Sequence, residues 1–105
     1  MNKFYTLTIN GEDYKLRLTA SAIMQIEKKL GKSLFSALET IRENMIETLI
    51  TIIWGAMQPF NANTTFEKAS LLFDRYIDDG NSIEDLMLEI NSLFEASGFF
   101  KKGQA

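Results

Sequence analysis

The sequence contains no cysteine and no histidine, and these two absences exclude much of the chemistry that small proteins perform. Without cysteine there is no disulfide framework, no thiolate zinc site and no cysteine nucleophile. Without histidine the chain lacks the commonest general base and the commonest metal ligand, so a Ser-His-Asp triad is impossible. Carboxylates, lysine, tyrosine, serine and threonine remain as candidates, and they form no visible catalytic apparatus in this sequence. We therefore expect a protein that is not an enzyme and that uses neither a metal, a cofactor nor a small-molecule substrate.

Long hydrophobic runs and a surplus of basic residues are missing too. The most apolar segment, residues 49–57, is interrupted by Thr51 and Gly55, and it is far shorter than the ~18–20 apolar residues of a membrane span. No signal-peptide-like stretch opens the sequence. The formal net charge is −3, whereas binding to a phosphate backbone favours a basic face. The composition predicts a cytoplasmic protein that binds neither nucleic acid nor a membrane.

The chain begins with an alternation of apolar and polar residues over residues 4–18. A period of two is typical of strands, and the Asn10-Gly11 pair is the strongest short hairpin signal. A two-residue loop pairs Leu7 with Tyr14, whereas a four-residue loop shifts the pairing by two residues and keeps the same face inward. Both registers stay open. In either of them the inward face carries the alternating apolar residues, which are Tyr5, Leu7, Ile9, Tyr14, Leu16 and Leu18.

Residues 20–98 show helical periodicity, divided by glycines at 31, 80 and 98. The predicted helices begin at Thr19 or Ser21, at Ser33, near Met45, at Thr64 and at Ser82. Thr64 with Glu67 forms a predicted capping box. The third helix is apolar nearly all round, which predicts a central position. Periodicity also assigns to the apolar faces four residues that we return to below: Met24, Phe35, Ile46 and Met87.

The 105 residues correspond to one domain. Its predicted class is α+β, mostly α, with an N-terminal β-hairpin (4–18) packed on a small bundle of four to five helices (20–98). A flexible tail (101–105) is expected to follow. About 60% helix is expected.

Charge is distributed unevenly along the chain. Residues 1–63 contain seven basic and six acidic residues, a net of +1, whereas residues 64–100 contain two basic and eight acidic residues, a net of −6. This acidic surface is either a solvated polar face or a docking surface for a basic partner or a second copy. The candidate self-association charges are Lys28, Lys29 and Lys32 on one side and Asp78, Asp79, Glu84 and Asp85 on the other.

Two acidic clusters invite a chemical interpretation that their spacing does not support. The run from Asp78 to Asn81 lacks the glycine that a calcium loop needs at its sixth position, which Ile83 occupies. Glu84 and Asp85 lie in the first turn of a helix, where the dipole favours anions, and nothing in their pattern suggests the burial that a catalytic pair requires. Both clusters are better explained as helix ends.

Several aromatic and apolar residues are candidates for partner binding. The Phe99-Phe100 pair follows a helix stop, and it either folds back onto the core or forms an exposed hook for another protein. Trp54 with Met57 and Phe60 presents the same two alternatives. The full set of candidate partner-binding residues is Phe94, Phe99, Phe100, Trp54, Met57 and Phe60.

Segments spread over nearly the whole chain resemble the tail assembly chaperones of long-tailed bacteriophages and prophages of Gram-positive bacteria. The segments are YKLRLTA at 14–20, IEKKLGKS at 26–33, the stretch 66–80 ending in YIDDG and followed by Ser82-Ile83, and LFEASGFF at 93–100. The resemblance rests on their shared order, because each segment is short.

This resemblance implies a siphovirus-type protein that binds the tape measure protein, a very long helical chain, and shields its apolar stripes until tail-tube subunits polymerise around it. It implies a site of action in the cytoplasm of the bacterial host, absence from the finished virion, and no catalytic residues. The competing hypothesis is a small cytoplasmic helical adaptor or regulatory protein-interaction module. Gene neighbourhood separates the two, since only a chaperone requires an adjacent tape measure gene.

Overall fold

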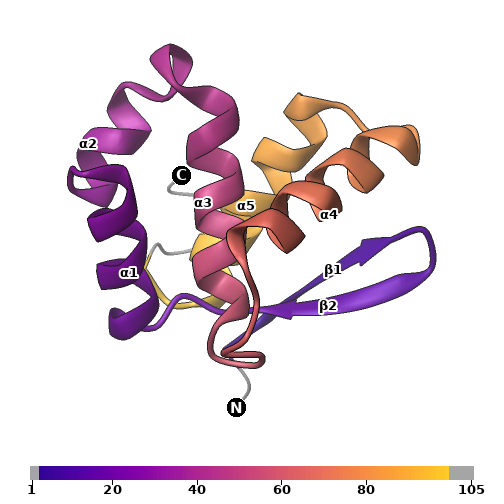
Figure 1. Ribbon diagram of the computed structural model, residues 1–105, viewed down its shortest axis with the longest axis horizontal. Helices are drawn as coiled ribbons and strands as arrows, with labels where there is room; N and C mark the ends of the chain where they lie inside the picture. The colour runs from indigo at the N-terminus through magenta and orange to yellow at the C-terminus, as the bar shows by residue number, and fades with distance from the viewer. Residues whose placement is uncertain (1–2, 100–105) are drawn as a thin grey trace.

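The computed structural model describes residues 3–99, which form a two-stranded antiparallel sheet followed by five α-helices and one 3-10 turn (Figure 1). Helices make up 62% of it, so the predicted class, α+β and mostly α, is confirmed. The predicted tail at 101–105 and Phe100 lie outside the described residues. The elements are β1 (Tyr5–Ile9), β2 (Glu12–Leu16), α1 (Ala20–Leu30), α2 (Leu34–Glu39), η1 (Ile41–Glu43), α3 (Met45–Met57), α4 (Phe66–Asp78) and α5 (Ile83–Ala96).

The hairpin has the two-residue loop. Leu7 pairs with Tyr14 and Ile9 with Glu12, so the four-residue alternative is excluded. Asn10 and Gly11 take positive φ values of 51° and 82°, which the tight turn between twisted strands requires. The inward face of the hairpin packs under the helices, and its aliphatic residues Leu7, Ile9 and Leu16 are fully buried.

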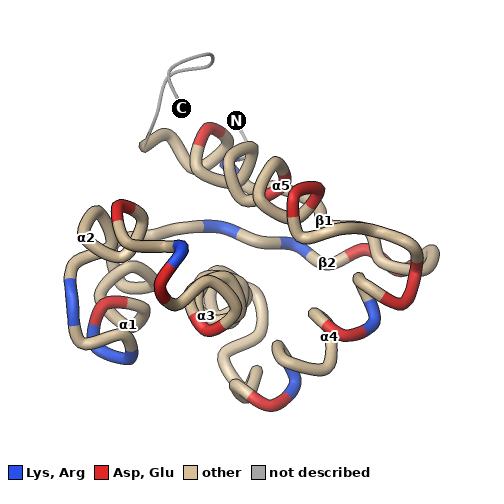
Figure 2. The backbone as a smooth tube through the Cα atoms, turned by 90° about the horizontal axis from the view of Figure 1, so that it is seen from above, with Lys and Arg blue, Asp and Glu red and all other residues tan. Residues whose placement is uncertain are grey.

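Helix α3 is the centre of the fold, as its apolar composition predicts. Figure 2 shows α3 nearly end-on, with α1 and α2 to its left, α5 above it and α4 to its lower right. Nine of its thirteen residues are buried. Helix α1 approaches it closely at Gly55, where an added Cβ would lie 2.3 Å from Cγ1 of Ile26. The hairpin is tied to the same helix, because the Arg17 N–H donates to the Ala56 carbonyl at 2.9 Å.

Helix α5 is fastened to the N-terminal part of the chain by two long-range hydrogen bonds. The Tyr5 hydroxyl on β1 donates to Glu89 in the middle of α5. The Leu18 N–H, just after β2, donates to the Ser97 hydroxyl just after α5, at 2.9 Å. Helices α3, α4 and α5 therefore all contact the hairpin (Figure 1).

Most of the predicted helix caps are confirmed. Thr19, Ser33 and Ser82 each accept a hydrogen bond from a backbone N–H of the first turn. The prediction for α4 is wrong by one residue, because Thr65 rather than Thr64 is its N-cap. Thr64 is buried and donates its hydroxyl to the Asn61 carbonyl at 2.8 Å. Its side chain is therefore committed to the turn that precedes the helix.

Four residues that periodicity places on apolar faces lie at the surface instead. Helices α1 and α2 each bury only one narrow side. A residue two positions before or after a buried residue is rotated by about 200° around the helix axis and therefore points away from the core. Met24 lies two residues after the buried Ala22, and Phe35 two residues before the buried Ala37. The exposed fractions are 63% for Met24, 68% for Phe35, 43% for Ile46 and 37% for Met87.

Candidate functional site

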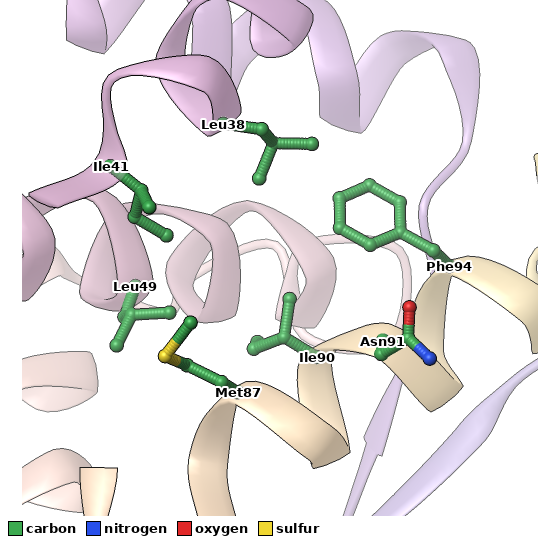
Figure 3. Close-up of a pocket in the computed structure, with 7 residues that line it drawn as sticks. All are labelled: Leu38, Ile41, Leu49, Met87, Ile90, Asn91 and Phe94. Atoms are coloured by element: carbon green, nitrogen blue, oxygen red, sulfur yellow. The ribbon is translucent and has the colours of Figure 1, made fainter. Parts of the chain in front are cut away.

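An apolar groove of about 240 Å³ runs between α5 and the wall formed by α2, η1 and α3 (Figure 3). Side chains from both sides point into it, and only one of them is polar. In Figure 3, Leu38 and Phe94 face each other across the groove, with Met87 and Ile90 along the α5 side. The complete lining is Leu38, Ile41, Leu49, Met87, Ile90, Asn91 and Phe94.

The sequence builds the α5 wall through helical spacing. Met87, Ile90, Asn91 and Phe94 stand at positions i, i+3, i+4 and i+7, which places them on one side of the helix over two turns. Leu86 and Leu93 lie beside this row and are buried in the core. Ile90 and Phe94 of the row are buried as well, at 5% and 4% exposed, so on the α5 side Met87 and Asn91 offer most of the accessible surface of the groove.

The opposite wall depends on how early α2 ends. Helix α2 has only six residues, and Thr40 leaves the helical conformation with φ −108° and ψ 25°. The chain then makes the η1 turn before α3 begins. Leu38 and Ile41 stand on either side of this break and are half-buried, whereas Leu49 at the bottom of the groove is fully buried.

The predicted partner-binding residues do not form one surface. Phe94 lines the groove and is 4% exposed, whereas Phe99, just beyond α5, is 48% exposed. Phe99 is therefore not buried in the core, and Phe100 lies outside the described residues. Met57 is buried, so it offers almost no surface to a partner.

Trp54 and Phe60 belong to two further clusters, each completed by a lysine. The half-buried Trp54 stands edge-on to Phe66 of α4, with centroids 6.5 Å apart, and the Lys29 Nζ lies 5.3 Å from the Trp54 ring. The exposed Phe60 pairs with Phe4 at 5.9 Å, under the Nζ of Lys15. Cation–π contacts of this kind hold exposed rings in place.

The candidate self-association charges lie in two separate regions, at the end of α1 and at the turn between α4 and α5 (Figure 2). Some of them have local partners. Lys32 donates to the Thr40 hydroxyl at 3.4 Å, Asp79 accepts the Asn10 N–H at 3.1 Å, and Asp85 completes the Ser82 capping box. Lys29 lies over the rings of Trp54 and Phe66. All seven charged residues are exposed.

A second polar cluster joins β1, α4 and α5 around Glu89. Tyr5 donates to one carboxylate oxygen, and Tyr76 donates to the other at 3.1 Å. Desolvation by burial raises the pKa of both tyrosines above its ordinary value of 10, and the negative charge of Glu89 and its hydrogen bonds raise it further. The cluster therefore acts as a polar junction between three elements, with both phenols held in the protonated state.

Sequence reasoning missed most of the groove. Periodicity places Leu38, Ile41, Leu49 and Ile90 on apolar helix faces but does not indicate a groove, and no pattern distinguishes Asn91. One sequence signal could have indicated the α5 wall of the groove. The apolar face of this helix is wide, because it includes Met87 in addition to the residues that are buried in the core. No comparable signal exists for the α2 wall, because an apolar stripe does not reveal whether another helix covers it.

Two kinds of functional feature are absent from residues 3–99. No group of three or more carboxylates there is close enough together to hold a metal ion. No helix in this part of the chain combines the length and apolar character that crossing a membrane requires.

By class, then, this is a small α+β domain in which a β-hairpin supports a helical bundle with an apolar surface groove. The chain belongs to DUF6096, a family of unknown function, whose model matches residues 3–105. No curated protein and no solved structure matches this chain. Membership in this family assigns no activity.

Proposed function

We propose that the protein is a non-enzymatic tail assembly chaperone of a long-tailed phage or prophage, which binds the tape measure protein and shields it during tail morphogenesis. The sequence resemblance names the client, and the apolar groove beside α5 is the observation that carries the proposal. A long helical client exposes apolar stripes before assembly, and a groove lined by aliphatic and aromatic side chains is the usual receptor for such a stripe.

The dimensions of the groove favour a helix over a small molecule. Its volume of about 240 Å³ lies below the ~300–1,000 Å³ typical of small-molecule pockets. Its α5 wall extends for two helical turns, which is about 10 Å and matches one apolar row of a client helix. Met87 stands in this wall and is 37% exposed. Its flexible thioether side chain adapts to irregular partners, as a client with many different apolar stripes would demand.

The proposal places the protein in the cytoplasm of the bacterial host, where tails assemble. As a chaperone it would leave its client when tail-tube subunits polymerise, and it would be absent from the finished virion. Neither a cofactor nor an enzymatic step enters this role.

The test is a pull-down of tape measure fragments by the full chain and by two matched variants. Met87→Glu puts a charge into the groove, and Met24→Glu makes the same change at an exposed methionine on α1, away from the groove. We expect Met87→Glu to reduce recovery of the fragments at least tenfold, and Met24→Glu to leave it unchanged. Circular dichroism checks that both variants keep their helices. Equal recovery with Met87→Glu and wild type, or no recovery by wild type, would contradict the proposal.

A deletion of residues 99–105 examines whether the end of the chain contributes to client binding. The deletion leaves Ser97 and its hydrogen bond to Leu18 in place. We expect fragment recovery to be lost while the circular dichroism spectrum stays helical. Loss of the helical spectrum would instead mean that residues 99–105 are needed for the fold.

A further inference from the structure

Asn91 is the polar exception in the wall of the groove, since every other residue that lines it is apolar. It stands four residues after Met87 and three before Phe94, which puts it in the middle of the α5 row. Figure 3 shows its amide group on the α5 side, beside Ile90 and Phe94. The side chain is half-buried, so a helix that fills the groove must lie against it.

The amide group of Asn91 has no hydrogen-bond partner within residues 3–99. Other amides of the fold are used, because Gln58 donates to the Thr64 carbonyl and Asn81 to the Tyr76 carbonyl. The Asn91 amide offers two donor hydrogens and one acceptor oxygen. In the open groove it still reaches water, since the side chain is only half-buried. The protein thus leaves one amide unpaired at the place where a client would exclude that water.

The client side chain that lies over Asn91 decides what happens to this amide. An aliphatic side chain displaces water and leaves the donor and the acceptor unpaired, which lowers affinity. The side chain of an asparagine or glutamine restores both hydrogen bonds, because two amides can donate to each other's oxygen. A single buried asparagine sets the register of paired helices in coiled coils for the same reason.

We infer that Asn91 is the specificity-determining residue of this groove, and that it selects a client helix whose apolar row is interrupted by one asparagine or glutamine. The inference rests on the proposed function, since it specifies which segments of a client the same groove accepts. The client amide pairs with Asn91, while the apolar residues one turn before and after it lie against Met87 and Phe94. Along a client with many apolar stripes, this pairing determines where the groove binds and in which register.

Two synthetic peptides of about 18 residues, long enough to form a helix, test this inference. Both carry one leucine row and differ only at its central position, which is glutamine in one peptide and methionine in the other. These two residues are similar in length and in helix propensity, so the peptides differ mainly in the amide. Fluorescence anisotropy with the full chain measures their Kd values at 50 mM and 300 mM salt. We expect the glutamine peptide to bind at least tenfold more tightly at both salt concentrations, because neutral amides are not subject to screening.

Two leucine variants separate the amide of Asn91 from a general effect of the substitution. Asn91→Leu replaces the amide by an apolar group of similar size, and Asn63→Leu makes the same change at an exposed loop residue outside the groove lining. We expect Asn91→Leu to reverse the preference, so that the methionine peptide binds more tightly. We expect Asn63→Leu to keep the wild-type preference.

NMR of the side-chain amides reports on the hydrogen bond directly. The NH2 signals of Asn91 are assigned by their absence from the spectrum of Asn91→Leu. We expect the glutamine peptide to shift them downfield, as hydrogen bonding does, and the methionine peptide not to do so. A purely structural role of Asn91 would not produce this difference between the two complexes.

The outcomes distinguish this inference from the function on which it rests. Equal affinity of the wild-type chain for both peptides, or an unchanged preference in Asn91→Leu, overturns the selection by Asn91 and leaves the groove as a helix site. Failure of both peptides to bind, while Met87→Glu still abolishes recovery of tape measure fragments, overturns the selection alone. Peptide binding only by a chain that ends at residue 99 would make the chain's own end the occupant, and a dimer lost in Met87→Glu would make it a second copy. Either result overturns an external client helix.

Discussion

At the scale of single residues, Gly55 sets the distance between α1 and α3. An added Cβ would lie 2.3 Å and 2.6 Å from two carbons of Ile26 and 3.3 Å from the Ala22 carbonyl oxygen. Ile26 is completely buried, so its side chain cannot turn out into solvent to make room. The two helices can approach this closely only because residue 55 has no side chain.

Gly55→Ala should therefore destabilise the fold by about 1–3 kcal/mol, the usual cost of forcing extra volume into a packed core. The better helix propensity of alanine, worth about 1 kcal/mol, opposes this loss. Urea unfolding measures the net effect. In the Gly55→Ala background, Ile26→Ala should cost less than in wild type, because it removes the clashing atoms. Additive effects of the two substitutions would mean that the contact is not the cause.

The two tyrosines on Glu89 predict a loss of stability at alkaline pH. Their pKa is raised in the folded state, so the unfolded chain ionises them first as the pH rises above 10. Unfolding then releases protons, and the free energy of unfolding falls as the pH increases. Urea titrations from pH 8 to pH 11 should show this decline starting near pH 10.

The variant Tyr5→Phe with Tyr76→Phe serves as the comparison. It should be less stable than wild type at pH 8, because it leaves the Glu89 carboxylate without two donors. It should also show a shallower decline above pH 10. A wild-type protein whose stability is constant up to pH 11 would show that the cluster does not hold its protons as described.

Single residues also mark where sequence reasoning reaches its limit. Asn10-Gly11 specifies its turn by itself, because both positive φ values belong to the pair. Thr64 and Thr65 are adjacent and chemically identical, so local pattern cannot decide which of them caps α4. Burial of Thr64 and its bond to Asn61 decide it, and neither is visible in the sequence.

At the scale of elements, the N-cap of α4 provides a direct test of the corrected boundary. Thr65→Ala removes the side-chain acceptor for the Lys68 N–H, which is 3.0 Å away. The expected cost is about 0.5–2 kcal/mol, the usual value of an N-cap. Thermal or urea unfolding measures it, and Thr65→Ser should recover most of the stability because it keeps the hydroxyl. If Thr65→Ala has no effect, Thr65 is not the cap.

Element order and type were largely predictable, whereas the relation between elements was not. Glycines, caps and apolar periodicity indicated all five helices and the hairpin. The same periodicity put Phe35 and Ile46 on apolar faces, but the structure leaves both exposed. The groove likewise lies between the apolar faces of α5 and of the wall formed by α2, η1 and α3. How closely two such faces pack depends on the arrangement of the helices in space, which a periodic pattern does not reveal.

At the scale of the whole molecule, the candidate self-association charges form a basic pole (Lys28, Lys29 and Lys32) and an acidic pole (Asp78, Asp79, Glu84 and Asp85). The basic end of α1 and the acidic turn between α4 and α5 lie in separate regions of the fold (Figure 2). A contact between the basic pole of one copy and the acidic pole of the next would be head-to-tail, and such contacts build rings or open chains rather than closed dimers. An arrangement of this kind would suit a protein that coats a long client.

We therefore expect weak, salt-sensitive self-association. Light scattering should give an average mass above 12.0 kDa at low salt and high protein concentration, and the monomer mass at high salt, where exposed charges are screened. Lys28→Gln with Lys32→Gln should give the monomer mass under both conditions. A monomer at low and high salt for the wild-type chain would remove this expectation.

The hydrogen bonds that fasten α5 to the hairpin also constrain the order of folding during synthesis. Tyr5 reaches a partner 84 residues away, and Leu18 reaches one 79 residues away. A ribosome adds ~5–20 residues per second, so the hairpin waits for seconds with part of its apolar face uncovered before Ser97 emerges. During that interval the nascent chain exposes a strand pair that is prone to pair with other chains. The nascent chain would thus be most vulnerable to aggregation just before its translation reaches the end of α5.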